Sequence, residues 1–314
     1  MAILKSERHH WWPEVLSHYW ADSEGCAHWI DPTGRVKRMP PKNLGVIGNG
    51  HHIKFGNDGE STVWDESFEQ TFSVADSNFP RIIDWLTSLR REILFDIPLD
   101  RRFLPEEASD KDICDLIECV VSLAIRSPKN REAAVAWAEQ LRGPLPSKER
   151  NRLIGANMRN DMANAVKSLG GRGKFVAIFS PEREFIFGDG FFHTIRSPAN
   201  SVSDAKIFVP LTPSLAVLYV RPMSYRTLPR ILTLVVTPDE TDALNDAVQV
   251  YARDKIFFRS QQPSLLEHFT QGKHLRYSDY RNPVDQLIDS IPGIDRPSRF
   301  LETWFNNISE STVP

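Results

Sequence analysis

The sequence predicts an α+β fold in which helices and strands occupy separate stretches of the chain. Amphipathic helical patterns fill residues 63–170, and short apolar runs bounded by turn residues come before and after them. Such grouping is typical of α+β proteins, whereas a doubly wound sheet needs strands and helices in regular alternation. The chain has 314 residues, of which 41% are hydrophobic, and this is enough for a sizeable core. We therefore expect one α+β domain over residues 1–282, whose β-rich part covers about 171–260.

The segment before the helical block is expected to consist of short elements. Residues 11–20 can form a short helix. The turn residues Asp31-Pro32-Thr33-Gly34 separate two strand-like runs and predict a β-hairpin, because Pro and Gly favour tight turns. The stretch 45–59 holds five Gly residues and is predicted to be a loop.

Four helices are expected in the central block. Apolar residues recur at three- and four-residue steps from Phe68 to Leu89, and Pro80 is expected to kink or divide this helix. The other three are predicted, each with Gly or Pro soon after its end, at residues 110–125, 132–141 and 148–169.

Strands dominate the chain after residue 170. The runs 175–179 and 184–187 are expected to pair as a hairpin around Ser180-Pro181-Glu182. A second hairpin is predicted from 207–211 and 215–220, joined through Thr212-Pro213.

One more helix is expected in this part, with a strand after it. Thr237 can cap the helix and Pro238 can take its first position, and the helix runs to about Arg253. The strand 256–258 follows. The tail, 283–314, can form one docking helix, with its apolar residues at Phe300, Leu301, Trp304 and Phe305.

Composition predicts an ordinary cytoplasmic protein. The net charge is −3, so the chain as a whole has no basic signature of a nucleic-acid-binding protein. No apolar run approaches the roughly 20 residues of a membrane span, and the first ten residues lack the apolar core of a signal peptide. The three Cys residues are not spaced as a zinc site, and we expect reduced thiols and no membrane association.

The strongest candidates for catalysis are His9, His10 and Asp189. An imidazole titrates near neutral pH, so either His can act as acid, base or metal ligand. Asp189 lies at a strand end between two Gly residues, where a rigid scaffold can present a carboxylate. It can act as a base or a metal ligand, or it can only accept backbone N–H groups in its turn. One His can equally pack against the neighbouring Trp residues.

A divalent cation such as Mg is the cofactor that the acidic residues allow. Glu66 and Glu69 are three residues apart, and with Asp189 they can supply oxygen ligands, although paired Glu residues on a helix are commonly only solvated. His51 and His52 can in principle join the two N-terminal His residues in a zinc site, but without Cys and at long separation.

Candidate substrate-binding residues are mostly cations. Arg126 ends an apolar helix, where it can clamp a phosphate or carboxylate, or simply complement the helix dipole. Residues 142–174 hold eight Lys and Arg against two acidic residues, a stripe that can follow a nucleic acid or face an acidic neighbour. The candidates for substrate binding are Arg131, Arg150, Arg152, Arg159, Asn245 and Arg253.

A series of short motifs resembles one bacterial family over roughly residues 8–260. In order they are His9-His10-Trp11-Trp12-Pro13 with Leu16, Trp29-Ile30-Asp31, Pro41 to Val46, Trp64 to Ile83, Arg126-Ser127-Pro128, Gly188-Asp189-Gly190-Phe191, Val209 to Pro213, Leu244-Asn245 and Ala252-Arg253. This order resembles the bacterial domain of unknown function 4238. Asp76 or Ser77 stands where the family often has a second Glu. Only Asp189 remains of the usual Ser-Asp-Asn-Pro.

Two functions of different classes follow. The first is a phosphodiesterase or nuclease that serves as a toxin or antiphage effector, which the resemblance allows because such domains often occur in bacterial conflict systems. The second is a non-catalytic binding or sensor protein that recognises a protein partner or a phage component. For the first we expect the His9–His10 segment to pack near Asp189, and Asp189→Ala and Arg126→Ala to abolish activity with the fold intact.

Overall fold

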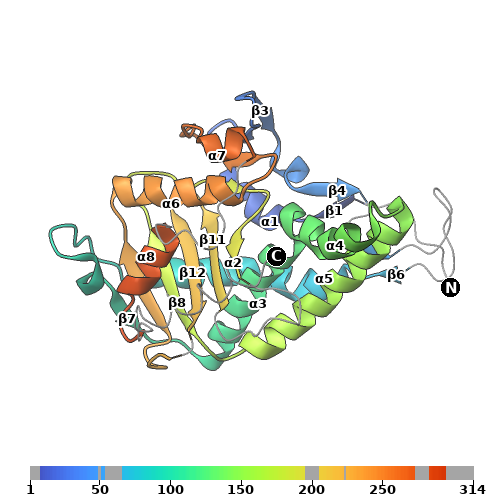
Figure 1. The fold of residues 1–314 in the computed structure, drawn as a ribbon. Coiled ribbons are helices and arrows are strands. Elements are labelled where there is room, and N and C mark those ends of the chain that lie inside the picture. The colour runs from blue at the N-terminus through green and yellow to red at the C-terminus, as the bar shows by residue number, and fades with distance from the viewer. Residues whose placement is uncertain are drawn as a thin grey trace, which may run out of the picture.

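A computed structural model describes residues 8–48, 51–53, 66–194, 205–222, 224–272 and 283–294. It confirms the α+β class, because a block of helices lies beside sheets built from the N-terminal and C-terminal segments (Figure 1). In this view the helices α2–α5 lie mainly to the right of the large sheet, and α6 and α8 lie toward its other side.

The large sheet has six strands in the order β10-β11-β12-β8-β13-β7. Neighbouring strands are antiparallel, apart from the parallel pair β8 and β13. Every residue of β8 is buried, which explains its near-continuous apolar sequence. The strands are β7 (Leu104–Glu106), β8 (Lys174–Phe179), β10 (Phe192–His193), β11 (Ala205–Thr212), β12 (Leu215–Arg221) and β13 (Ile231–Val235).

A four-stranded sheet in the order β3-β2-β14-β9 and two small strand pairs complete the β structure. The sheet joins the predicted N-terminal hairpin to a strand more than 200 residues later, since Trp29 faces Phe257. The pair β1–β4 and the pair β5–β6 bring β1 next to the start of α2. These strands are β1 (Arg8–His10), β2 (Ala27–Ile30), β3 (Val36–Met39), β4 (Val46–Gly48), β5 (His52–Ile53), β6 (Glu66–Ser67), β9 (Phe187–Gly188) and β14 (Ile256–Phe258).

The four predicted central helices are present. Pro80 neither divides nor ends the first, which is one helix. Ser127 ends α3 and also caps α4 by accepting the N–H of Asn130 at 3.3 Å, so Pro128 starts a new helix rather than a loop. The helices are α2 (Gln70–Ser88), α3 (Asp110–Arg126), α4 (Pro128–Arg142) and α5 (Ser147–Leu169).

The remaining helices are short or lie along the sheets. Thr237 caps α6 as predicted, since its side chain accepts the N–H of Glu240. The Glu240 side chain accepts the N–H of Thr237, which completes a capping box. None of the helices in the described ranges is long and apolar enough to cross a bilayer. They are α1 (Glu14–Ser17), α6 (Pro238–Tyr251), α7 (Glu267–Thr270), α8 (Pro283–Ser290) and the 3₁₀ turns η1 (His18–Trp20), η2 (Pro41–Asn43) and η3 (Leu99–Arg101).

One predicted hairpin is wrong. The runs 175–179 and 184–187 do not pair with each other, because β8 lies between β12 and β13 while β9 joins β14 in the other sheet. The turn between them instead contacts α6, because the hydroxyls of Ser180 and Thr241 form a hydrogen bond of 2.8 Å. The predicted loop 45–59 also contains β4 and β5, and the strands β7 and β13 were not predicted.

The start of the C-terminal tail packs on the domain. Val284, Leu287 and Ile288 of α8 are buried, and Lys206 of β11 pairs with Asp285 at 3.2 Å. The apolar residues Phe300 to Phe305, expected to form a docking helix, lie outside the described residues.

Candidate functional site

Three segments bring two histidines and a glutamate together beside the helical block. His9 lies on β1, His51 directly precedes β5, and Glu69 is the N-cap residue of α2. The backbone of His51 is held on both sides, because its N–H donates to His9 Nδ1 at 3.0 Å and its carbonyl accepts the N–H of Phe68 at 2.9 Å. The pairing of β5 with β6 therefore fixes His51 against the start of α2.

Glu69 lies between the two imidazoles. His51 Nδ1 and Glu69 Oε2 form a short hydrogen bond, and His9 Nε2 lies 3.7 Å from the same oxygen. The two rings are stacked with centroids 5.0 Å apart. His9 is 3% and His51 1% exposed, whereas 44% of the Glu69 side chain is accessible. Glu69 is therefore the most solvent-exposed member of the cluster.

The hydrogen bonds assign a tautomer to each ring. His9 Nδ1 accepts a backbone N–H, so its ring proton sits on Nε2, facing Glu69. An ionised carboxylate only accepts, so His51 donates from Nδ1 and keeps a lone pair on Nε2. Glu69 therefore accepts the Nδ1–H of His51 and faces the Nε2–H of His9, while the lone pair of His51 Nε2 points away from the carboxylate.

Burial and charge shift the pKa values of this cluster in known directions. Burial lowers the pKa of His51 below its ordinary 6.5, although the Glu69 hydrogen bond acts the other way. Burial raises the pKa of Glu69, but the hydrogen bond from His51 and the neighbouring positive charges, including Arg126, outweigh it and leave the pKa below 4.5. The cluster therefore favours a neutral His51 and an ionised Glu69 near neutral pH.

Arg126 supplies a buried positive charge next to the cluster. It is completely buried at the end of α3, and its two terminal nitrogens contact the carboxylate of Asp76, one of them at 3.1 Å. Its guanidinium lies 5.1 Å from the centre of the Phe72 ring, and the His51 ring lies 4.9 Å from the same ring. Because its terminal nitrogens are engaged by Asp76, Arg126 acts on this cluster through its field rather than as a free phosphate clamp.

The spacing on α2 explains this arrangement. Glu69, Phe72 and Asp76 are three and four residues apart, so they share one face of the helix. That face meets the end of α3, where Arg126 lies. Asp76 is one of the two residues, with Ser77, at which the family resemblance places the second acidic group, and here it is the partner of Arg126.

The same three side chains are the metal-ligating group that the described residues bring together. One donor atom from each of His9, His51 and Glu69 lies within 4.8 Å of the others. Two imidazoles and a carboxylate suit zinc or another transition ion better than Mg. A metal on His9 Nε2 needs the proton on Nδ1, which then faces the N–H of His51. The His9 ring must therefore turn before the set can hold a metal.

Asp189, by contrast, is held by the backbone. Its two oxygens accept the N–H groups of Arg253 at 2.7 Å and Asp254 at 2.9 Å. Its own carbonyl accepts the N–H of Lys129 at 3.2 Å. The side chain is 3% exposed, and burial raises its pKa above 3.8. These contacts support the turn role rather than the catalytic role, and Asp189 is not part of the convergent group of described ligands.

The glycines around Asp189 allow close packing. A Cβ on Gly190 would lie 2.2 Å from the carbonyl oxygen of Tyr251 and 2.7 Å from Cδ of Lys129. A Cβ on Gly188 would lie 2.6 Å from that of Ala252. The Gly-Asp-Gly turn thus joins the start of α4, the end of α6 and the start of β14.

The expected proximity of the N-terminal segment to this turn is confirmed through its aromatic residues. The ring of Trp12 stacks on Phe187 at 4.0 Å, and Trp11 lies 6.4 Å from Phe191. His10 does not carry this contact, because its Nδ1 pairs with the carbonyl of Leu44 at 3.1 Å. The side chain of Glu66 lies outside the described residues, so its predicted metal role stays a prediction.

The predicted substrate-binding residues take several roles. Arg150 pairs with Glu132 and, at 3.0 Å, with Glu139, so part of the basic stripe faces an acidic neighbour. Arg253 pairs with Glu132 at 3.3 Å. Burial lowers the pKa of Arg131 to about 10. Arg152 and Arg159 are half-buried on α5.

Asn245 serves the fold. It is buried on α6, where its amide accepts the N–H of Ile186 at 3.0 Å and donates to the carbonyl of Glu184 at 2.9 Å. It therefore attaches α6 to the segment before β9.

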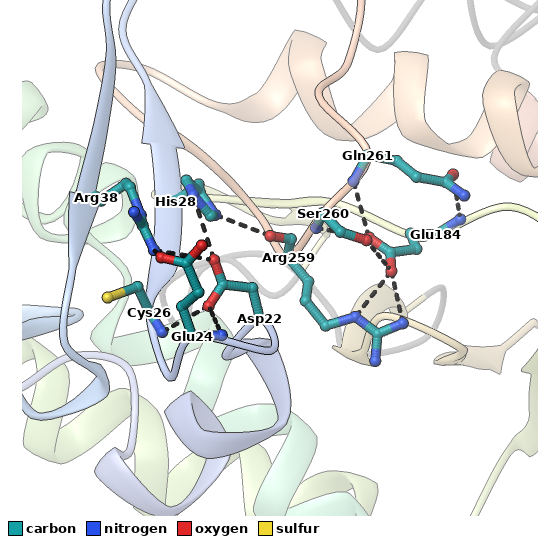
Figure 2. A network of polar contacts seen from close by, with 9 residues as sticks. All are labelled: Asp22, Glu24, Cys26, His28, Arg38, Glu184, Arg259, Ser260 and Gln261. Atoms are coloured by element: carbon teal, nitrogen blue, oxygen red, sulfur yellow. Dashed lines mark hydrogen bonds and ion pairs between the residues drawn. The ribbon is translucent and has the colours of Figure 1, made fainter.

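A second polar network lies between the β2–β3 hairpin and residues 259–261 (Figure 2). Asp22 accepts backbone N–H groups of the turn that follows it, and its carboxylate lies 3.6 Å from His28. Nδ1 of His28 contacts the carbonyl of Arg259 at 2.8 Å. Glu184 accepts the backbone N–H of Ser260 at 2.9 Å and also binds the Arg259 side chain. The His28 contact attaches the hairpin to the segment after β14, and the Glu184 contacts attach the segment before β9 to the same residues.

The sequence carries only a partial signal for the His cluster. It indicates His9 as a catalytic residue, Glu69 as a metal ligand and His51 as a zinc ligand, but it does not join the three. A strand predicted next to His51 would have placed these residues together. The five Gly residues of 45–59 predict a loop there instead.

The comparisons with known proteins agree with the resemblance. The family model described as "Protein of unknown function (DUF4238)" matches residues 8–262, which is most of the 314-residue chain. No curated protein and no solved structure matches the chain. The chain therefore belongs to the DUF4238 family.

Proposed function

We propose that the chain cleaves phosphodiester bonds by general base catalysis at the cluster of His9, His51 and Glu69. The observation that carries this proposal is the His51–Glu69 pair with a second imidazole stacked on it. A carboxylate that fixes the tautomer of an imidazole is the arrangement by which many hydrolases orient a base.

Each group has a distinct task in this reaction. His51 Nε2 takes the proton of the attacking hydroxyl or water, and Glu69 stabilises the imidazolium that results. The proton then passes to the leaving oxygen. The Nε2–H of His9 donates a hydrogen bond to a phosphoryl oxygen, a role open to a neutral ring. Arg126 favours negative charge in the same region through its field.

The choice of a phosphodiester rests on the surroundings of the cluster. The helix α5, which carries Arg152 and Arg159, packs against β5, next to His51. Cations beside an acid–base site fit an anionic polymer better than a neutral substrate. A nuclease of this kind fits the role of a toxin or antiphage effector.

The test is cleavage of end-labelled RNA and DNA, single- and double-stranded, with and without a chelator. We expect cleavage of at least one of them by the native chain and none by His51→Gln. His28→Gln is the matched control, because His28 also lies beside a carboxylate and its side chain is only 17% exposed, but it belongs to the separate Asp22 network. Intact substrates in every arm would contradict the proposal.

The alternative, a non-catalytic binding protein, is favoured by one observation. Both imidazoles are almost fully covered, so a substrate reaches them only after the residues around them move. Labelling of histidines by diethyl pyrocarbonate distinguishes the catalytic function from the non-catalytic one. Addition of a cleaved oligonucleotide should change the labelling of His9 and His51 if the cluster binds it.

A further inference from the structure

The donor atoms of His9, His51 and Glu69 lie close enough together to bind one metal ion. One donor atom from each side chain lies within 4.8 Å of the other two. Ligand atoms around a tetrahedral zinc ion are about 3.3 Å apart, because each is about 2.0–2.1 Å from the metal. The 3.7 Å between His9 Nε2 and the Glu69 carboxylate is near this spacing. His51 Nδ1 and the same carboxylate are closer than this, because a proton lies between them, and they must separate when an ion replaces that proton.

The charges around the cluster suit a cation. Arg126 is the positive charge beside it, and Asp76 pairs with that guanidinium. Both imidazoles are neutral in the tautomers assigned above, so the carboxylate of Glu69 leaves one negative charge uncompensated. The Glu69 side chain is 44% exposed, so little packing holds its carboxylate in place. The carboxylate can therefore shift by the small distance that coordination needs.

The hydrogen bonds of the cluster nevertheless hold protons rather than a metal. His9 Nδ1 accepts the N–H of His51 at 3.0 Å, which keeps the ring proton of His9 on Nε2. Coordination through Nε2 needs that proton on Nδ1, so His9 must first give up its bond to the backbone. In a permanent metal site, second-shell hydrogen bonds instead fix the coordinating tautomer. We therefore expect this cluster to bind a metal reversibly, as a regulator rather than as a resident cofactor.

We propose that a zinc ion bound at this cluster inactivates His51 as a base. A neutral imidazole has one ring proton and one lone pair. In the metal-free cluster His51 donates the proton of Nδ1 to Glu69 and keeps the lone pair on Nε2. When Nδ1 binds the ion, its proton leaves and Nε2 takes one up, so the charge of the ring does not change. The lone pair that accepts the proton of the attacking hydroxyl is then absent. This inhibition rests on the proposed cleavage activity, whereas zinc binding and the exchange of tautomers do not.

The donor set favours zinc over the common hard cations. Two imidazole nitrogens and one carboxylate oxygen are typical ligands of zinc, and water can fill the fourth tetrahedral position. Mg²⁺ and Ca²⁺ prefer oxygen ligands and rarely accept two imidazoles. Mg²⁺ is therefore the control ion in each experiment below.

A second imidazole–carboxylate pair provides a matched control within the same chain. His28 Nε2 lies 3.6 Å from Asp22, nearly the 3.7 Å between His9 Nε2 and Glu69. Among the described residues no third ligand converges on this pair as His51 does on the other. Two ligands bind zinc less tightly than three, so His28→Gln should leave the strongest zinc binding of the chain unchanged.

Competition with a chromophoric chelator measures zinc binding. A Cys114→Ser background removes the exposed thiol, which can bind zinc by itself. We expect a single zinc ion per chain, bound at least about 30-fold more weakly by His51→Gln and by Glu69→Gln and equally well by His28→Gln. Zinc should also raise the melting temperature of the chain but not that of the His51→Gln variant, which shows that the variant is folded and lacks the site. Zinc binding that survives both cluster substitutions would overturn the proposal, as would displacement of zinc by Mg²⁺.

Nuclear magnetic resonance of histidine-labelled chain tests the exchange of tautomers. Two-bond ¹H–¹⁵N correlations identify which ring nitrogen carries the proton, and zinc does not broaden them because it is diamagnetic. Without zinc we expect His51 to be protonated at Nδ1, and with zinc at Nε2. The His51→Gln variant assigns the signal, because it lacks it. A His51 ring that keeps its Nδ1 proton when zinc is bound would overturn the exchange.

Cleavage of a labelled oligonucleotide at increasing zinc concentration tests the inhibition itself. We expect the rate to fall with a midpoint equal to the dissociation constant from the binding experiment, and a chelator to restore it. A rate that rises as zinc fills the site would overturn the proposal, because zinc would then be a cofactor. A chain that cleaves nothing with or without zinc would overturn the proposed function and the inhibition together. The zinc site itself is decided by the binding and resonance experiments, which need no cleavage.

Discussion

The Asp189 turn and the His9–His51–Glu69 cluster both join distant segments through polar groups, yet their partners differ. The oxygens of Asp189 accept backbone N–H groups, which neither titrate nor move independently of the fold. In the cluster the carboxylate of Glu69 contacts two imidazoles, which can gain or lose protons. Burial alone therefore does not separate a structural carboxylate from a reactive one; the nature of the partners does.

This difference makes the cluster, rather than the Asp189 turn, the better candidate for a catalytic site. The Gly-Asp-Gly pattern drew attention to Asp189, but the glycines permit close packing and the carboxylate binds the end of α6. The cluster has no comparable local pattern, since its residues are 42 and 18 positions apart along the chain. Substitutions at the two carboxylates can show whether the partners of a carboxylate decide its role.

The largest effect is expected from Glu69→Gln. The amide keeps the size of the side chain but cannot stabilise an imidazolium, so cleavage should fall about 10²- to 10⁴-fold. The melting temperature should change little, because the Glu69 side chain is 44% exposed. Initial rates and thermal unfolding of the same preparations measure both. A variant that keeps full activity would remove Glu69 from the mechanism.

The opposite pattern is expected from Asp189→Ala. Its loss leaves the N–H groups of Arg253 and Asp254 without acceptors, which should lower the free energy of unfolding by about 2–4 kcal/mol. Asp189→Asn keeps one acceptor oxygen and should lose less. Urea unfolding measures the stability, and activity per folded molecule should stay unchanged. Lost activity with native stability would return Asp189 to the catalytic site.

Much of the fold could be predicted because its signals are local. The period of apolar residues and the cap Thr237 lie within a few residues of what they specify. The pairing of β8 could not be read in this way. Both its neighbours come from later in the chain, and its continuous burial leaves no alternation to mark a partner.

The site follows the same rule. Arg126 could be identified from its place at a helix end, but its partner Asp76 is 50 residues away and depends on how α2 meets α3. The contact of His51 with His9 depends on two pairs of short strands, β1 with β4 and β5 with β6. Tertiary contacts of this kind leave no spacing in the sequence.

A smaller effect is expected from pH. The folded pKa of His51 lies below its ordinary 6.5, so the unfolded chain binds this proton more readily. Stability should therefore fall as the pH drops below about 6.5, by less than the roughly 1.4 kcal/mol per pH unit of one full proton. Urea unfolding of the native chain and His51→Gln between pH 5 and 8 isolates this contribution. Equal slopes for both chains would show that His51 titrates normally.

The smallest effect is expected from Arg150→Ala, which tests the basic stripe 142–174. Arg150 is held by Glu132 and Glu139 at a partly exposed surface, and such pairs contribute about 0–1 kcal/mol. A cation already paired with two carboxylates releases no counterion from a nucleic acid. Binding measured at several salt concentrations should keep its slope after this substitution, whereas a true phosphate contact would reduce the slope by about one. A reduced slope would mean that Arg150 leaves its acidic partners to bind the polymer, and that the stripe is an interface despite its ion pairs.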